Sequence, residues 1–208
     1  TYRGEKAETS SSALIGAKVT KVTFKLKRNG TPTGTASVDP TDDSVYEGDE
    51  TAGISISGVS GGGASESGSQ SVTVTITENE SAPTVTLSVS ASSIAENAGS
   101  SITLTATLSN GTYQDVTAAL GTSGTATEGT DYTDGSGNID DITISAGSTT
   151  GTVNFTPTDD SFYDATSNET ATISVTGVSG GGASESGTQA VTITITDNES
   201  APTVTLAT

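Results

Sequence analysis

The feature that most constrains this chain is a long internal duplication. Residues 50–87 recur almost letter for letter as residues 169–206, at an offset of 119 residues, and the shorter block 33–44 recurs at 150–161. Such an offset is far longer than the roughly 20–50 residues of solenoid repeats and is close to the size of one small β-domain. The chain is therefore predicted to be a piece of a tandem array, whose function lies in one domain and in the joints between domains.

Apolar residues alternate with Thr or Ser through much of the chain, and no stretch has a helical period. A period of two predicts strands with one buried face. They are expected at residues 72–77, 84–88, 102–108, 142–144, 152–155, 172–175 and 191–196. Turns rich in Gly, Asn and Ser separate them about every 10 residues, which is typical of an antiparallel sandwich of about seven strands. The predicted fold class is all-β, as tandem immunoglobulin-like β-sandwiches.

The triple-Gly segment at residues 61–68 is repeated at residues 180–187. It has no Lys and is followed by a strand, whereas a phosphate-binding loop leads into a helix N-terminus. We expect a flexible hairpin tip.

Charge is divided unevenly along the chain. All seven Lys and Arg residues lie in the first 28 positions, and 23 of the 25 Asp and Glu residues lie between positions 39 and 208. Residues 39–208 contain no Lys or Arg and cannot neutralise phosphates. Nucleic acid and anionic membranes are therefore poor partners, and cations are favoured. Because the chain has no Cys and no His, it has no soft-metal site, thiol nucleophile or histidine base, and an enzyme is disfavoured.

One acidic segment is the sharpest candidate site. Asp159-Asp160-Ser161-Phe162-Tyr163-Asp164 leads to Glu169, and residues 42–50 repeat this arrangement. Carboxylates gathered in one loop suit Ca²⁺, which takes about six to eight oxygen ligands in irregular geometry. A solvated acidic loop is the plain alternative. A glycosidase carboxylate pair is a third, but it needs a sugar cleft with aromatic platforms, and the chain has no Trp.

Four elements of residues 84–199 resemble the Calx-beta domain, which occurs in sodium–calcium exchangers, an integrin subunit and many bacterial surface adhesins. They are Ile94-Ala95-Glu96-Asn97, the segment 124–132, the Asp159-Asp160 loop and the closing Ile195-Thr196-Asp197-Asn198. The resemblance implies a Ca²⁺ site at one end of the sandwich, with ligands Glu96, Asp131, Asp159, Asp160, Asp164, Glu169 and Asp197. The sequence departs from the family pattern in two places. The usual Asp-Glu pair before the next strand is stretched by two residues, to Asp164-Ala165-Thr166-Ser167-Asn168-Glu169, and the closing acidic triplet reads Asp197-Asn198-Glu199.

The first copy is recognisable from residue 33 onward and has no counterpart of the Glu-Asn and Asp-Tyr elements. Its acids at matching positions are Asp42, Asp43, Glu47, Asp49, Glu50 and Glu78. Residues 1–32 predict a basic β-hairpin of an uncertain module, turning at Asn29-Gly30. The expected organisation is therefore the hairpin segment 1–32, a partial Calx-beta-like repeat at 33–81, a complete one at 82–199, and the first strand of a further repeat at 200–208.

These patterns together predict that the chain is part of a bacterial or archaeal adhesin or fibre protein at the cell surface. It would form an extracellular stalk or fibre of Ca²⁺-stabilised sandwiches and have no enzymatic activity. The expected partners are calcium, neighbouring repeats and copies of the chain itself, possibly in a filament. Residues 201–208 either begin a further repeat or complete the first repeat of a neighbouring chain by strand addition. Alternative functions are a glycan- or protein-binding module and an accessory domain of a secreted hydrolase.

Overall fold

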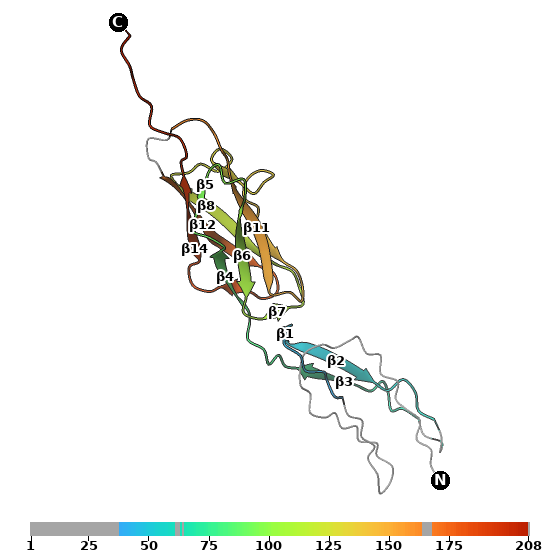
Figure 1. Ribbon diagram of the computed structural model, residues 1–208. Helices are drawn as coiled ribbons and strands as arrows, with labels where there is room; N and C mark the ends of the chain where they lie inside the picture. The colour runs from blue at the N-terminus through green and yellow to red at the C-terminus, as the bar shows by residue number, and fades with distance from the viewer. Residues whose placement is uncertain (1–37, 61–62, 64, 164–167, 208) are drawn as a thin grey trace. The chain divides into compact units, whose positions relative to one another are not determined.

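A computed structural model describes residues 38–60, 63, 65–163 and 168–207 (Figure 1). These residues form strands, turns and loops and contain no helix, which confirms the predicted all-β class. No helix of the described residues therefore has the length and apolar character needed to cross a membrane. The chain divides into two compact units, Thr1–Ser81 and Ala82–Thr208, called unit 1 and unit 2 here.

Unit 2 is a sandwich of two five-stranded sheets. The first sheet has, in spatial order, β10 (Ile142–Ile144), β8 (Val116–Gly124), β12 (Asn168–Ser179), β14 (Ala190–Thr196) and β5 (Ser93–Ala95). The second has β13 (Ser184–Glu185), β4 (Thr84–Val89), β6 (Ile102–Leu108), β11 (Thr150–Pro157) and β9 (Tyr132–Thr133). The short strand β7 (Gly111–Thr112) lies between β6 and β8 in the sequence.

The core of unit 2 lies between the sheets and follows from the period of two. In β6 every second residue, from Ile102 to Leu108, is buried, and the Thr residues between them are half-buried. Val85 and Leu87 of β4 join the same cluster. Removing such side chains from water supplies roughly 1.5–3 kcal/mol each. The two sheets are therefore held together by apolar packing, which is mostly aliphatic and includes the stacked rings of Tyr132 and Phe155.

The structure differs from the predicted sandwich in three respects. The two sheets contain ten strands, because β5, β9 and β13 add short pieces at the edges. Two edge pairings, β13 with β4 and β14 with β5, are parallel, so the sandwich is not purely antiparallel. Strand β8 was missed because its small residues, Val116-Thr-Ala-Ala-Leu-Gly-Thr-Ser-Gly124, lack a clear alternation of large apolar side chains.

The described part of unit 1 contains β1 (Val45–Tyr46), β2 (Glu50–Ser55) and β3 (Ser71–Ile76). Strands β2 and β3 pair in the register of β12 and β14: Glu50 lies opposite Ile76, as Glu169 lies opposite Ile195. The duplicated sequence therefore forms the same strand pair twice. The hairpin predicted for residues 1–32 lies outside the described residues.

The Gly-rich segment of unit 2 is not a flexible tip. At Gly180, where φ is +89°, an added Cβ would lie 2.1 Å from the backbone oxygen of Asp115. At Gly181 it would lie 2.8 Å from the side chain of Thr112. The loop therefore packs against the segment that leads into β8, and only Gly fits there.

The residues after this loop fasten strand β4, and we call residues 184–189 the clip of unit 2. The N–H groups of Ser184 and Ser186 donate to the backbone oxygens of Pro83 and Val85, at 3.1 and 3.0 Å. The side-chain oxygen of Gln189 accepts the N–H of Leu87 at 3.2 Å. The side-chain nitrogen of Gln189 donates to the Ser186 backbone oxygen at 2.5 Å, which closes the clip on itself.

Substituting Gly180 tests whether this loop is rigid. Gly180→Ala is expected to destabilise unit 2 by about 1–3 kcal/mol, because it places a Cβ against Asp115 at a positive φ. Gly177→Ala is the matched control, since an added Cβ meets nothing within 4 Å there. The measurement is urea unfolding of the full chain. Equal stability of the two variants would contradict the packed loop.

Candidate metal centre

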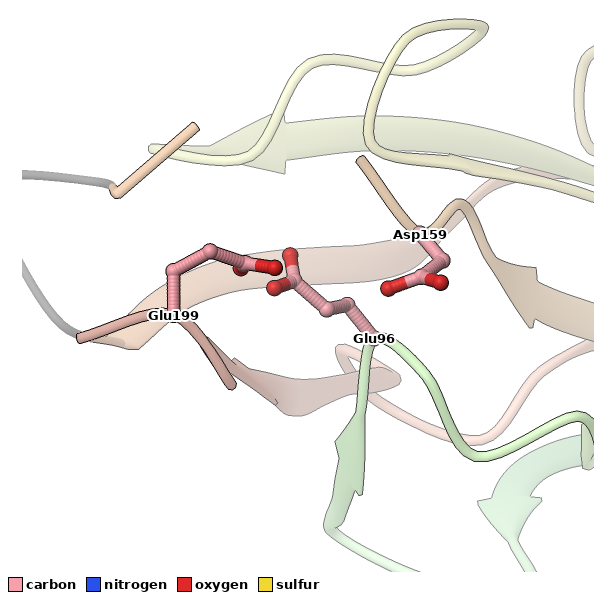
Figure 2. Close-up of side chains that lie close together, drawn as sticks. All are labelled: Glu96, Asp159 and Glu199. Atoms are coloured by element: carbon pink, nitrogen blue, oxygen red, sulfur yellow. The ribbon is translucent and has the colours of Figure 1, made fainter. Parts of the chain in front are cut away.

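Three carboxylates from distant parts of the sequence meet at one end of unit 2. Oxygens of Glu96, Asp159 and Glu199 lie within 4.8 Å of one another. Figure 2 shows the three side chains converging from separate segments, with their carboxylate groups close together. Among the described residues this is the one trio of acids whose oxygens come so close.

Backbone pairing places each member of the trio. Glu96 follows β5, and its N–H donates to the Thr196 oxygen at 3.1 Å, so it lies beside the end of β14. Its carboxylate accepts the N–H of Asn198 at 3.1 Å, which sets the course of the chain towards Glu199. Asp159 comes two residues after β11, where the Thr158 N–H donates to the Asp131 oxygen at 2.9 Å. The site therefore forms where the chain leaves strands β5, β11 and β14.

The electrostatics of the trio are unfavourable without a counter-charge. Glu96 is 7 % exposed, Glu199 is half-buried and Asp159 is exposed. A hydrogen bond shared with Glu96, then burial, then the neighbouring Asp197 raise the pKa of Glu199 from 4.5 to about 7. One carboxylate oxygen of Glu199 is buried and has no hydrogen-bond partner. The site therefore favours a bound proton or cation.

The other acids predicted for this site hold their own loops and are not part of the trio. Asp131 accepts the Thr127 N–H at 2.6 Å, Asp160 accepts that of Phe162 at 2.6 Å, and Asp197 accepts that of Glu199 at 2.8 Å. Glu169 lies on β12 opposite Ile195. Asp164 lies outside the described residues.

Glu199 is the residue that the sequence analysis missed. The resemblance to the family pointed to Asp197 as the acid of the closing segment, whereas the acid two positions later lies in the cluster. The available signal was Glu80, which repeats Glu199 at the offset of 119 residues. In both units an acid follows the Asn after the last strand.

The predicted acids of unit 1 surround Glu78. Burial acts to raise the pKa of Glu78, but N–H groups of Glu47, Glu80 and Gly48 donate to its carboxylate and lower that pKa to about 2. Two of these bonds, from Glu47 and Gly48, measure 2.5 and 2.8 Å. Glu78 thus acts as an internal anion that ties β1 to the end of β3.

The other acids predicted for unit 1, together with Glu80, divide into two groups. Three accept hydrogen bonds: Asp42 from the Asn79 side chain at 3.1 Å, Asp43 from the Val45 N–H at 2.7 Å, and Asp49 from the Glu78 N–H at 2.9 Å. Glu47, Glu50 and Glu80 each have a buried carboxylate oxygen without a hydrogen-bond partner. Burial first, and then the charge of Glu50 and Asp43, raise the pKa of Glu47.

Comparison with protein families gives two matches to one model, the Calx-beta domain, at residues 17–80 and 78–199. Together they cover most of the chain. The chain belongs to the Calx-beta domain family. The first match begins upstream of Thr33, where the internal duplication becomes visible. No curated protein matches the chain.

Calx-beta domains are Ca²⁺-binding β-sandwiches, the family is non-catalytic, and its members usually occur in extracellular or membrane-protein regions. The trio fits such an ion. Carboxylate oxygens are the ligands of hard cations, and Glu199 has a buried oxygen without a partner. Glu96, Asp159 and Glu199 would therefore hold Ca²⁺ in this Calx-beta domain, and the ion would supply the positive charge that the site lacks.

The raised pKa of Glu199 predicts how the ion-free chain responds to pH. A carboxyl group whose pKa is higher in the folded state stabilises that state while it is protonated, and this contribution is lost as the pH rises through the folded-state pKa. With a chelator present, raising the pH from about 5 to about 8 is expected to lower the Tm of unit 2, because Glu199 loses its proton near pH 7.

Glu199→Gln is expected to remove most of this pH dependence, since its amide cannot ionise. Glu185→Gln is the control because Glu185 belongs to the clip, where it accepts the Gln189 N–H. Thermal unfolding followed by circular dichroism gives the comparison. The assignment fails if Glu199→Gln retains the full pH dependence of the unaltered chain.

Proposed function

We propose that this chain is part of an extracellular stalk or fibre in which Ca²⁺ stabilises successive Calx-beta sandwiches. The observation that carries the proposal is the convergence of Glu96, Asp159 and Glu199 in a sequence with no Lys, Arg or His after Arg28. No side chain of unit 2 can neutralise these acids. A cation from the medium is therefore the natural partner, and calcium is the hard cation that tolerates irregular oxygen ligands.

The position of the trio supports a role in stiffening the array. Glu96, Asp159 and Glu199 come from three separate segments, and an ion bound by all three would join them. Glu199 is also followed at once by Ser200-Ala201-Pro202, the sequence that reappears between the two units as Ser81-Ala82-Pro83. An ion held by Glu199 would fix the chain just before a joint, where Pro already restricts the backbone.

The repetition itself supports a stalk more than a binding module. A stalk needs identical domains with identical joints, and the duplicated block includes both the last strand of each unit and the joint that follows it. The Gly-rich segment, which a glycan- or protein-binding module would expose as a loop, is packed against Thr112 and Asp115 in unit 2. This packing favours a structural role for the segment.

Calcium should raise the Tm of the full chain. An ion that binds only the folded state stabilises it by about 2.7 kcal/mol at 100 times its Kd. Asp159→Asn should remove most of this gain, because it deletes one ligand and no core contact. The experiment is thermal unfolding with calcium and with chelator. Isothermal titration calorimetry measures calcium binding directly.

Asp115→Asn is the matched control. It removes the same charge and keeps a side-chain oxygen for the Ala146 N–H, which Asp115 accepts at 2.8 Å. Asp115 lies beside Gly180, just after the end of β12, whereas the trio lies near the start of that strand. The calcium effect should survive in this variant. A Tm that is the same with calcium and chelator would sink the proposed ion site.

A further inference from the structure

The chain enters and leaves unit 2 at opposite ends of the sandwich. Strand β12 runs between these ends, with twelve residues and a length of roughly 40 Å. At its start, Asn168 lies opposite Thr196, the last residue of β14. Past its end, the clip begins at Ser184, which lies beside Thr84, the first residue of β4. Figure 1 shows β4 starting at one end of unit 2 and β14 finishing at the other. Tension along the chain would therefore pull β4 and β14 in opposite directions, close to the strand axes.

The segment after β4 joins the entering part of the chain directly to the leaving part. After a short connection the chain crosses to the other sheet as β5, which pairs with β14 in parallel. The N–H of Thr194 donates to the Ser92 oxygen at 3.0 Å. The N–H of Glu96 donates to the Thr196 oxygen at 3.1 Å. Beyond the strands, the N–H of Asn198 donates to the Glu96 carboxylate at 3.1 Å, which extends the link.

Parallel pairing decides how these hydrogen bonds would carry tension. Because β5 and β14 run in the same direction, pulling the start of β5 and the end of β14 slides the two strands past each other. The hydrogen bonds cross from strand to strand, so this sliding stretches all of them together. Pulling the same end of both strands would instead break them one after another. Each hydrogen bond is weak on its own, so the number that must break together sets the resistance.

Strand β4 is held against the same pull on both of its sides. It pairs with β6 from Val85 to Val89, and its first residues pair in parallel with β13 of the clip. The Leu87 N–H also donates to the Gln189 side chain at 3.2 Å. The side chains of Val85 and Leu87 are buried in the core. Both parallel strand pairings in the described part of unit 2 therefore involve a strand at which the chain enters or leaves.

We propose that unit 2 bears tension along the chain, with the parallel pair β5–β14 and the clipped strand β4 acting together as a mechanical clamp. The inference rests on the proposed stalk, because only a chain anchored at both ends carries such a load. It also gives the calcium site a further role. Glu96 directly follows β5, and Glu199 lies just beyond β14. An ion held by both would connect the two strands at the end where β14 is pulled.

Pulling the full chain in two directions tests the clamp. The chain has no Cys, so handles for optical tweezers attach only at introduced Cys residues. Ala82→Cys with Ala201→Cys gives the end-to-end geometry, which loads the clamp as a stalk would and leaves unit 1 outside the loaded path. Ser100→Cys with Ala201→Cys gives the same-end geometry. Ser100 lies between β5 and β6, so this control pulls the same β5–β14 bonds from the end of both strands. All three positions are exposed.

The first comparison is made with chelator present. The end-to-end geometry is expected to need at least about twice the unfolding force of the same-end geometry at one loading rate, because its hydrogen bonds must break together. Thermal unfolding of both Cys variants checks that they fold as the unaltered chain does. Equal forces in the two geometries would overturn the clamp.

The second comparison adds calcium. Calcium is expected to raise the unfolding force in the end-to-end geometry. Glu199→Gln should remove this increase, and Asp115→Asn, the control used for the ion site, should keep it. An unchanged force in a chain that calorimetry shows to bind calcium would overturn the role of the ion in the clamp. A chain that binds no calcium would contradict the proposed ion site, while the forces in chelator still decide the clamp, so the two failures are distinguishable.

Discussion

The structure depends on one electrostatic constraint: after Arg28 the chain has no basic side chain, so no carboxylate of unit 2 can form an ion pair with a side chain of its own unit. The described loops meet this constraint by using carboxylates as acceptors for backbone N–H groups. Asp131 binds the N–H of Thr127, and Asp141 binds that of Leu120. Hydrogen bonds from the N–H and hydroxyl of Ser136 and the N–H of Gly137 hold the pKa of Asp134 below its usual value. The acids thus order the loops that connect the strands.

The trio at the end of unit 2 departs from this arrangement. Glu96 receives one N–H, from Asn198, and Glu199 keeps a buried oxygen without a partner. Backbone donors do not satisfy the site, because strands β5 and β14 run parallel there and bring two carboxylates to one place. The charge that the site requires must come from a proton or a cation. Calcium, which Calx-beta domains bind, is a cation that would meet this requirement.

The two units also show how neighbours decide the structure of identical sequence. Ser184 and Glu185 form strand β13 because β4 lies beside them, whereas Ser65 and Glu66 form no strand. The side-chain hydrogen bonds of the clip are present in both units, since they involve only residues within the segment. Local interactions therefore form the clip, and tertiary pairing converts part of it into a strand.

Sequence alone determined the class of fold, most of the long strands and the array. The alternation in residues 102–108 predicts β6 because each apolar residue there has a core to fill, and the offset of 119 residues reveals the repeat without any structure. Strand β8 and the edge strands could not be predicted, because their residues are small and their pairing depends on neighbours far away in the chain. The site was predicted in part: Glu96 and Asp159 were nominated and do meet, whereas Glu199 was not. Only the tertiary structure selects between acids two residues apart, because the hydrogen bond from the Asn198 N–H to Glu96 sets the course of the chain that brings Glu199 to the other two carboxylates.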